Sequence, residues 1–152
     1  EDGRSLDETE AQIRATLPDA HLLLIPRTLE NLVKNGRAPK LAGQLTQMLN
    51  IRLAVSPEWK SGEIKAVKKG RGAKRIVANT MADCLEFLTE HPGSSVRVLT
   101  TGAAEEQELV NETLAGQDYV DAGTGPIGCT IATHVGVDAI AISYCPRYQP
   151  IH

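Results

Sequence analysis

Apolar residues recur along the chain with the spacing of amphipathic helices. The first such helix is predicted from Leu6 to about Leu17, because Ser5 and Glu8 form a capping box before it. The longest is predicted from about Ala73 to Glu90. Its apolar stripe consists of Val77, Met81, Cys84, Leu85 and Leu88. Shorter helices are predicted over residues 28–36, 39–49, 104–114 and 126–133.

Short apolar runs between these helices have the length of β-strands. They fall at residues 21–25, 51–55, 63–67, 96–99, 119–122 and 139–145. Alternating strands and helices predict one α/β domain over residues 1–152. The second and third runs are joined by a turn-rich segment, so they are expected to form a hairpin and to make the sheet mixed.

The composition is that of a globular protein, with 41% apolar residues, 23% charged residues and a net charge of −3 among 152 residues. Aromatic residues make up only 3%, which argues against a base-stacking nucleic-acid surface. No apolar run approaches the ~20 residues that span a bilayer. The acidic start EDGRSLDETE is not a signal peptide. We therefore expect a cytoplasmic protein without stable membrane insertion.

The chain lacks the common sequence motifs of enzymes. Cys84, Cys129 and Cys145 are widely spaced and outside any CxxC, so we interpret them as reduced thiols. No histidine pair has metal-ligand spacing, and no GxSxG, P-loop or HExxH occurs. The sequence predicts no metal, no cofactor and no complete active site, and hence no enzyme in this chain alone.

Gly123, Gly125 and Gly128 form a G-x-G-x-x-G pattern between a predicted strand and a predicted helix. A dinucleotide site also needs an acidic residue about 20 positions on, which falls here near Cys145. Pro126 removes one amide from the loop that would hold the pyrophosphate. We interpret the glycines as a tight strand-to-helix turn. A nucleotide-dependent oxidoreductase stays open on this pattern alone.

Six basic residues lie within eleven positions: Lys65, Lys68, Lys69, Arg71, Lys74 and Arg75. One interpretation is a solvated hairpin edge and helix start, since lysines protect an exposed strand. A nucleic-acid surface is disfavoured because the chain is acidic overall and carries no recognition motif. The functional alternative is a small anion, a phosphate or carboxylate, held where Gly70, Arg71 and Gly72 open a helix.

Two further positions carry candidate chemistry. Arg37 follows Asn35 and Gly36 in a loop between two predicted helices, and its guanidinium could clamp a carboxylate or phosphoryl oxygen. The alternative is an exposed loop charge. His134 follows a short predicted helix without a second histidine at ligand spacing. A lone histidine of this kind is most often structural or solvated.

The order of these motifs resembles the DegV family. A strand leads into TLENLVKNGR, a helix ends in LNI, Lys69-Gly70-Arg71 opens a long helix, and IGCTIATHVG precedes the last strand. The resemblance runs from about His21 to Pro146. It implies the second, C-terminal domain of a two-domain protein whose N-terminal domain is absent here: a two-layer α/β unit with about six mixed strands and helices on one face.

DegV proteins bind one long-chain fatty acid between two α/β domains, and some present its carboxylate to a separate fatty-acid kinase in phospholipid metabolism. The resemblance implies Arg37, Arg71 and His134 at the carboxylate or acyl-phosphate end, on a loop framework of Gly36, Thr133 and Gly136. Phosphoryl transfer needs positive charge at developing negative oxygens. Without its first domain, the chain is not expected to hold a fatty acid tightly.

Three positions depart from the family pattern. Leu53 replaces the proline of L-N-I-K-P, Asn35 replaces a glycine, and Val137-Asp138 replaces a Pro-Gly pair after His134. The last change could move the histidine loop or add a negative charge beside it. The alternative to lipid binding is therefore an interaction or regulatory module that keeps the fold without the ligand.

Overall fold

The computed structural model describes residues 3–44 and 50–147. Its helical elements are α1 (Leu6–Thr16), η1 (Leu17–Asp19), α2 (Glu30–Lys34), η2 (Pro39–Gln44), α3 (Gly72–Glu90), α4 (Ala104–Leu114) and α5 (Cys129–Val135). Its strands are β1 (His21–Ile25), β2 (Ile51–Pro57), β3 (Ile64–Arg71), β4 (Ser95–Thr100), β5 (Val120–Pro126) and β6 (Ile140–Cys145). The η elements are 3-10 helices.

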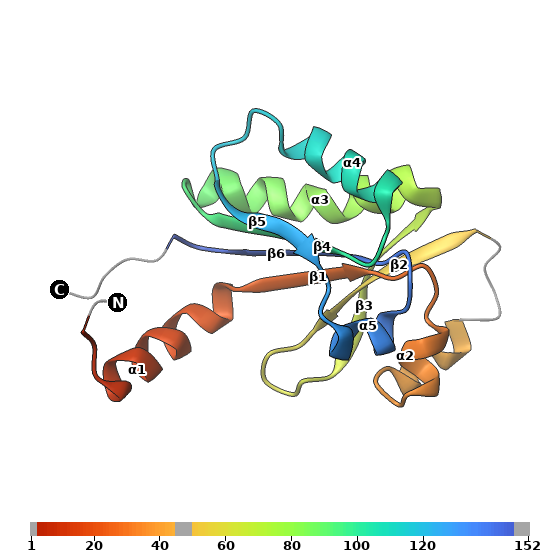
Figure 1. Ribbon diagram of the computed structural model, residues 1–152, viewed down its shortest axis with the longest axis horizontal. Helices are drawn as coiled ribbons and strands as arrows, with labels where there is room; N and C mark the ends of the chain where they lie inside the picture. Colours follow the sequence, from red (N-terminus) through yellow and green to blue (C-terminus); the bar gives the residue numbers. More distant parts are fainter. Residues whose placement is uncertain (1–2, 45–49, 148–152) are drawn as a thin grey trace.

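The strands form one six-stranded sheet in the order β3-β2-β1-β6-β4-β5. All neighbours are antiparallel except β4 and β5, which are parallel. The predicted α/β fold with a mixed sheet of about six strands is therefore confirmed. The hairpin of β2 and β3 forms one edge of the sheet, and β5 forms the other (Figure 1).

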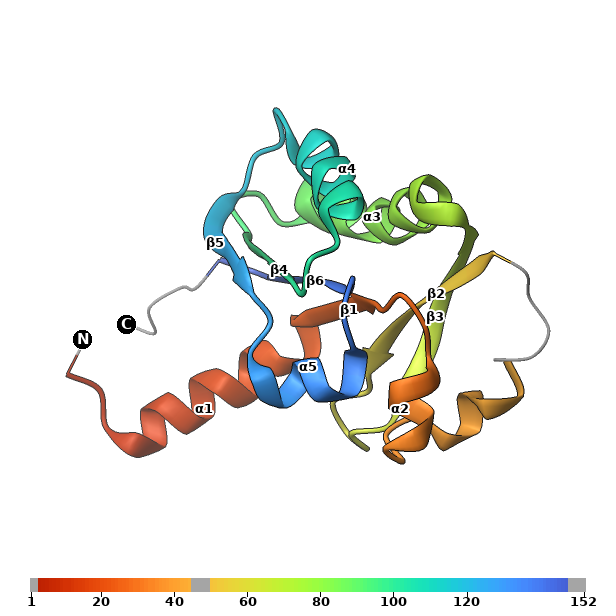
Figure 2. The same cartoon turned by 45° about the vertical axis from the view of Figure 1, so that its right-hand side comes forward.

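Helices cover both faces of this sheet. The long helices α3 and α4 lie on one face, whereas α2, η2 and α5 lie on the other (Figures 1 and 2). This differs from the expected two layers with helices on one face. The reason lies in strands such as β1, where Leu23 and Ile25 join the α3 core while Leu24 joins the α2 core. A strand that is apolar on both sides needs cover on both.

Local signals in the sequence set several element boundaries. Ser5 and Glu8 form the predicted capping box, and α1 begins at Leu6. Helix α4 spans the predicted 104–114. Thr28 accepts a hydrogen bond from the amide of Glu30 at 3.2 Å and so supports the start of α2. Of the helix predicted over 39–49, the first part forms η2, and residues 45–49 lie outside the described part of the chain.

The glycine pattern does not form the tight turn that we predicted. Gly123 and Gly125 lie inside β5, and only Gly128 caps α5. The register between β4 and β5 shifts between Val96 and Val98, and Gly123 has a φ of 97° at this irregularity. Glycine is needed here because a side chain disfavours that conformation. These residues thus continue an edge strand and build no phosphate-binding loop.

Candidate functional site

The loop that carries Arg37 is fixed by the end of α2. Gly36 has a φ of 67°, and its amide donates to the carbonyl of Val33 at 3.0 Å. The amide of Arg37 donates to the carbonyl of Leu32 at 2.8 Å. These two bonds form a Schellman motif, in which a left-handed glycine ends the helix. The backbone of Arg37 is therefore held, while its side chain is exposed.

His134 lies in the last turn of α5, and Gly136 ends this helix with a φ of 78°. A Cβ at Gly136 would stand 2.6 Å from the side-chain nitrogen of Asn31 on α2. A larger residue here would make the Asn31 side chain turn aside, and the left-handed φ of Gly136 itself favours glycine. The His134 side chain is half-buried, and its Nδ1 is buried without a hydrogen-bond partner in the described part of the protein.

A hydrogen bond joins these two helix ends directly. The side-chain amide of Asn35 donates to the carbonyl of Thr133 at 3.1 Å. Asn35 itself has a φ of −85°, so it does not use the left-handed conformation that asparagine tolerates. The structure thus brings Arg37 and His134 to neighbouring helix ends on one face of the sheet.

Arg71 reaches the same face through an irregularity in β3. Ala54 pairs with Lys68 and Val55 with Ala66, so Val67 is an extra residue in its strand. Before this bulge, Ile64 and Ala66 pack against the α2 core. Beyond it, Lys68 bonds Asp83 of α3 at 2.7 Å, so Lys68 faces the opposite side.

Alternation beyond the bulge then determines the direction of Arg71. Gly70 faces α3, where an added Cβ would overlap the backbone nitrogen of Ile76. Arg71, the next residue, therefore faces the side of α2 and α5, opposite Ile51 in the pairing. Arg37, Arg71 and His134 belong to one face of the sheet, although no hydrogen bond or ion pair joins Arg71 to the other two within the described residues.

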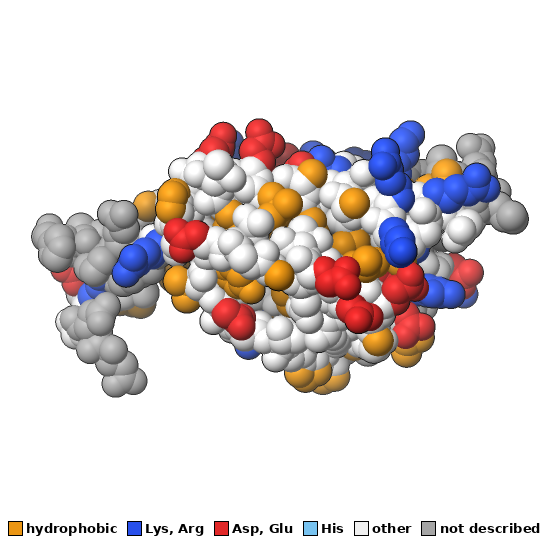
Figure 3. All heavy atoms as spheres, turned by 90° about the horizontal axis from the view of Figure 1, so that it is seen from above, with side chains coloured by type: hydrophobic (Ala, Val, Ile, Leu, Met, Phe, Trp, Pro, Cys, Tyr) orange, Lys and Arg blue, Asp and Glu red, His pale blue; other side chains and the backbone are white. Residues whose placement is uncertain are grey.

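The basic cluster divides into paired and unpaired charges. Lys65 forms an ion pair with Glu58 at 3.2 Å, and Lys68 pairs with Asp83 at 2.7 Å. The other four members, Lys69, Arg71, Lys74 and Arg75, are exposed and have no ion pair in the described chain. Basic side chains gather toward the end of the molecule where α3 begins (Figure 3). This end carries unneutralised positive charge.

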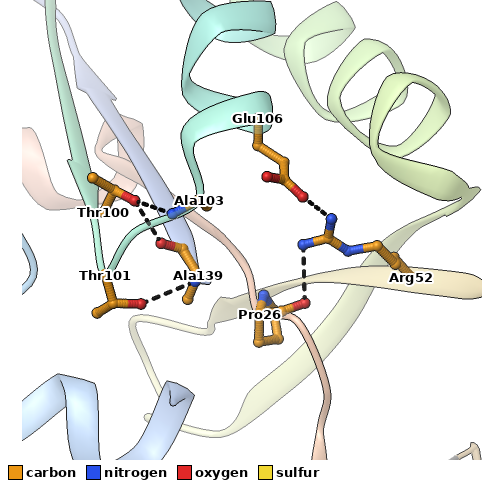
Figure 4. A network of polar contacts seen from close by, with 7 residues as sticks. All are labelled: Pro26, Arg52, Thr100, Thr101, Ala103, Glu106 and Ala139. Atoms are coloured by element: carbon orange, nitrogen blue, oxygen red, sulfur yellow. Dashed lines mark hydrogen bonds and ion pairs between the residues drawn. The ribbon is translucent and has the colours of Figure 1, made fainter. Parts of the chain in front are cut away.

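Two threonines that sequence reasoning missed hold the histidine loop. Thr101 Oγ1 donates to the carbonyl of Gly136 at 2.8 Å and accepts from the amide of Ala139 at 2.9 Å. Thr100 Oγ1 donates to the carbonyl of Ala139 at 3.1 Å and accepts from the amide of Ala103 (Figure 4). The signal in the sequence is a Thr-Thr-Gly step directly after a strand, a place where hydroxyls often bond neighbouring backbone.

Asp138, the residue that departs from the family pattern, adopts a left-handed conformation with a φ of 54°. Its carboxylate lies beside Gly102, where a Cβ would be 3.4 Å away. Within the described residues, no hydrogen bond or ion pair joins it to His134. Aspartate is among the few residues other than glycine that visit this conformation, so the loop keeps a turn that a glycine could also form.

A buried ion pair lies between β2 and α4. Arg52 Nη1 contacts Glu106 Oε1, and Arg52 Nη2 donates to the carbonyl of Pro26 at 3.5 Å (Figure 4). Their side chains are 9% and 6% exposed, so both charges are removed from water. Burial lowers the pKa of the Arg52 guanidinium, and the charge of Arg27 lowers it further. The pair ties the hairpin edge of the sheet to α4.

Cys84, Cys129 and Cys145 are free in the structure, and burial raises the pKa of the Cys84 thiol to about 12. Among residues 3–44 and 50–147, no group of three His, Cys, Asp or Glu side chains is arranged to hold a metal ion. No described helix combines the length and apolar character needed to cross a membrane.

By its architecture the chain is an α/β protein with a mixed sheet, and solved structures share that fold. One is a fatty acid binding DegV family protein from Streptococcus agalactiae, with 21% identity, a TM-score of 0.77, and coverage of 96% of this chain and 51% of that one. A DegV family protein from Thermus thermophilus, described for its fatty acid binding, has 23% identity and a TM-score of 0.81, with coverage of 95% and 51%.

The family model described as "Uncharacterised protein, DegV family" matches residues 1–147, so the chain belongs to the DegV family. A DegV domain-containing protein of Clostridium acetobutylicum is 27% identical over 150 residues, which cover 97% of this chain and 52% of that protein. A relative from Streptococcus pyogenes is 29% identical over 147 residues, with coverage of 97% and 51%. The chain thus spans about half the length of these relatives.

Proposed function

We propose that this chain is the C-terminal half of a fatty-acid-binding protein, in which Arg37, Arg71 and His134 hold the carboxylate of a long-chain fatty acid. The observation that carries the proposal is the bond from Asn35 to Thr133, because it places Arg37 beside the helix of His134. Membership of the DegV family supports the ligand class. A DegV family structure from Eubacterium eligens is described as loaded with heptadecanoic acid.

The chemistry of the three side chains fits a carboxylate. Guanidinium groups donate to carboxylate oxygens in fixed geometry, and an imidazole N–H can donate a further bond. The buried Nδ1 of His134 lacks a partner in the described structure, so one ring nitrogen is not committed to the protein. Asp138 lies beside Gly102, and within the described residues no hydrogen bond or ion pair joins its carboxylate to His134.

In the whole protein, we propose different roles for the two halves. The three side chains lie on one face of this half, and we propose that the N-terminal half closes the site and encloses the acyl tail. The carboxylate would then be presented to a separate fatty-acid kinase, as the resemblance implies. Positive charge from Arg37 and Arg71 would stabilise the phosphoryl group as it transfers.

Native mass spectrometry of the two-domain parent protein, purified from cells, tests the ligand. We expect a bound mass corresponding to one long-chain fatty acid. Arg37→Ala and Arg71→Ala should each weaken binding about tenfold or more, since a hydrogen bond to a charged group contributes about 1.5–3 kcal/mol. Arg75→Ala, which removes an exposed and unpaired arginine, is the matched control.

His134→Ala tests the head-group role separately from folding. With the cognate kinase, phosphorylation of the bound fatty acid should collapse while the free energy of unfolding stays near that of the wild type. A variant that unfolds, or one that keeps full phosphorylation, would contradict the assignment of His134. A parent protein that carries no lipid would favour an interaction module instead.

A further inference from the structure

A second candidate site lies on the opposite face of the sheet, under the C-terminal half of α3. It is a cleft of about 440 Å³. Its floor is formed by β1, β2, β3 and β6, and its wall by α3. Leu23 of β1, Ser56 of β2 and Val67 of β3 line it together with aromatic and acidic side chains. None of the residues proposed to bind the fatty acid is among them.

Aromatic rings from the floor and the wall of the cleft form one connected group. The rings of His21 and Tyr144 are stacked, with centroids 4.7 Å apart and planes inclined by 18°. Phe87 meets His21 edge-on with centroids 5.2 Å apart, and its ring is tilted against Tyr144 with centroids 5.0 Å apart. His91 lies against Phe87 at 4.4 Å. A protein with so few aromatic residues thus gathers two of them, with two histidines, at a single cleft.

The rim of the cleft is acidic. Asp19 precedes β1, and Asp83, Glu86 and Glu90 follow one another on α3. Lys68 neutralises Asp83 at 2.7 Å. The other three carboxylates have no ion pair among the described residues. The cleft therefore combines apolar ring surfaces with net negative charge.

Tyr144 offers an acceptor within the cleft. The residue lines the cleft and is only 3% exposed. Its hydroxyl has no hydrogen bond within the described part of the protein, and its oxygen is not among the fully buried side-chain atoms left unpaired there, so it meets the space of the cleft and is open to a donor. Burial also raises the pKa of the Tyr144 hydroxyl, so this oxygen stays protonated and can accept a bond from an N–H donor.

We propose that this cleft binds a guanidinium group. A guanidinium is planar and can stack on the exposed ring of His21, its N–H groups match the carboxylates of Glu86 and Glu90, and one N–H can donate to Tyr144. Desolvation lowers the pKa of His21, so a neutral imidazole faces the cation near pH 7. The donor could be a free small molecule or an arginine side chain; both share this chemistry.

A titration followed by NMR of the complete chain tests the proposal. The probes are N-acetylarginine methylamide, its neutral isostere N-acetylcitrulline methylamide, and agmatine, a free guanidinium compound. We expect saturable shifts at His21, Phe87 and Tyr144 with the arginine derivative, and at least tenfold weaker binding of the citrulline derivative. Tighter binding of agmatine than of the arginine derivative would point to a small molecule, and the reverse order to a polypeptide side chain.

Variants separate the site from non-specific attraction. Glu86→Gln combined with Glu90→Gln should weaken the arginine derivative about tenfold, and because both residues are exposed the fold should persist. Tyr144→Phe should weaken it several-fold. Glu108→Gln on α4 removes an exposed carboxylate outside the cleft and should leave binding unchanged. Absence of saturable shifts at millimolar probe, or equal binding by the double variant, would overturn the proposal.

Discussion

The side-chain amide of Asn35 bonds the carbonyl of Thr133, a residue 98 positions away, at 3.1 Å. This contact links the end of α2 to the last turn of α5. Since Arg37 and His134 follow these two anchor points by two residues and one, the bond holds the backbone segments that carry them next to each other. Asn35 stands where the family pattern has a glycine, and it contributes through its side chain and not through its backbone conformation.

Asn35→Ala should therefore change how the ends of α2 and α5 lie relative to each other more than it lowers the stability of the protein. We expect the free energy of unfolding to fall by about 1 kcal/mol or less, because the bond is neutral and exposed. The backbone NMR signals of residues 132–136 should shift. Asn111→Ala on α4, which removes an exposed asparagine elsewhere, should leave those signals in place. Unchanged signals in the Asn35 variant would show that the helix ends are held by packing alone.

Removal of one partner of the Arg52–Glu106 pair should destabilise the protein strongly, whereas replacement of both by apolar residues should not. Glu106→Leu leaves the Arg52 guanidinium buried without its partner, and we expect a loss of about 3–5 kcal/mol in denaturant unfolding. The double variant Arg52→Met with Glu106→Leu should recover most of this loss, since two apolar side chains of similar size can pack there. A double variant as unstable as the single one would contradict this account.

Gly70 should tolerate no side chain. A Cβ at this position would overlap the backbone of Ile76 at the start of α3, so the helix would have to move. We expect Gly70→Ala to lower the free energy of unfolding by about 1–3 kcal/mol. Gly43→Ala is the matched control, because no atom lies within 4 Å of its added Cβ. Equal stability of the two variants would show that β3 and α3 can separate easily.

His21 should make the protein less stable in mild acid. Desolvation lowers its pKa in the folded state, against charges of Asp19 and Asp83 that raise it. The unfolded chain, with a histidine pKa of about 6.5, then binds the proton more readily. The stabilising contribution of neutral His21 is complete above pH 6.5 and is lost as the pH falls below it. His21→Gln should flatten the slope of unfolding free energy as the pH falls below about 6.5.

Much of this fold follows from local sequence signals. The capping box of Ser5 and Glu8 depends on residues three positions apart and forms as predicted. In the predicted apolar stripe of α3, Val77, Met81, Cys84 and Leu88 are buried, whereas Leu85 is only half-buried. The loop glycine Gly36 adopts a left-handed conformation, which glycine favours at a helix end. Such features are set by backbone conformation and helical spacing, which a single sequence displays directly.

The parts that sequence missed depend on distant partners. Gly123 and Gly125 lie in a strand because that strand pairs with β4, and the residues around the glycines do not indicate this pairing. The roles of Thr100 and Thr101 depend on hydrogen bonds to Ala139 and Gly136, which are distant in the sequence. The candidate residues Arg37, Arg71 and His134 came from motif order, whereas their common face depends on sheet pairing and on a bulge.

The bulge at Val67 has a consequence for how the length of this protein can vary. Removing one residue between Ile64 and Lys68 would exchange the two sides of the strand beyond it, turning Arg71 toward α3 and bringing a side chain to the place of Gly70. Insertion of one residue would do the same. Insertions and deletions should therefore be excluded from this short stretch, while the turn at residues 58–62 can change length freely. The count of residues, as much as their identity, is what β3 must preserve.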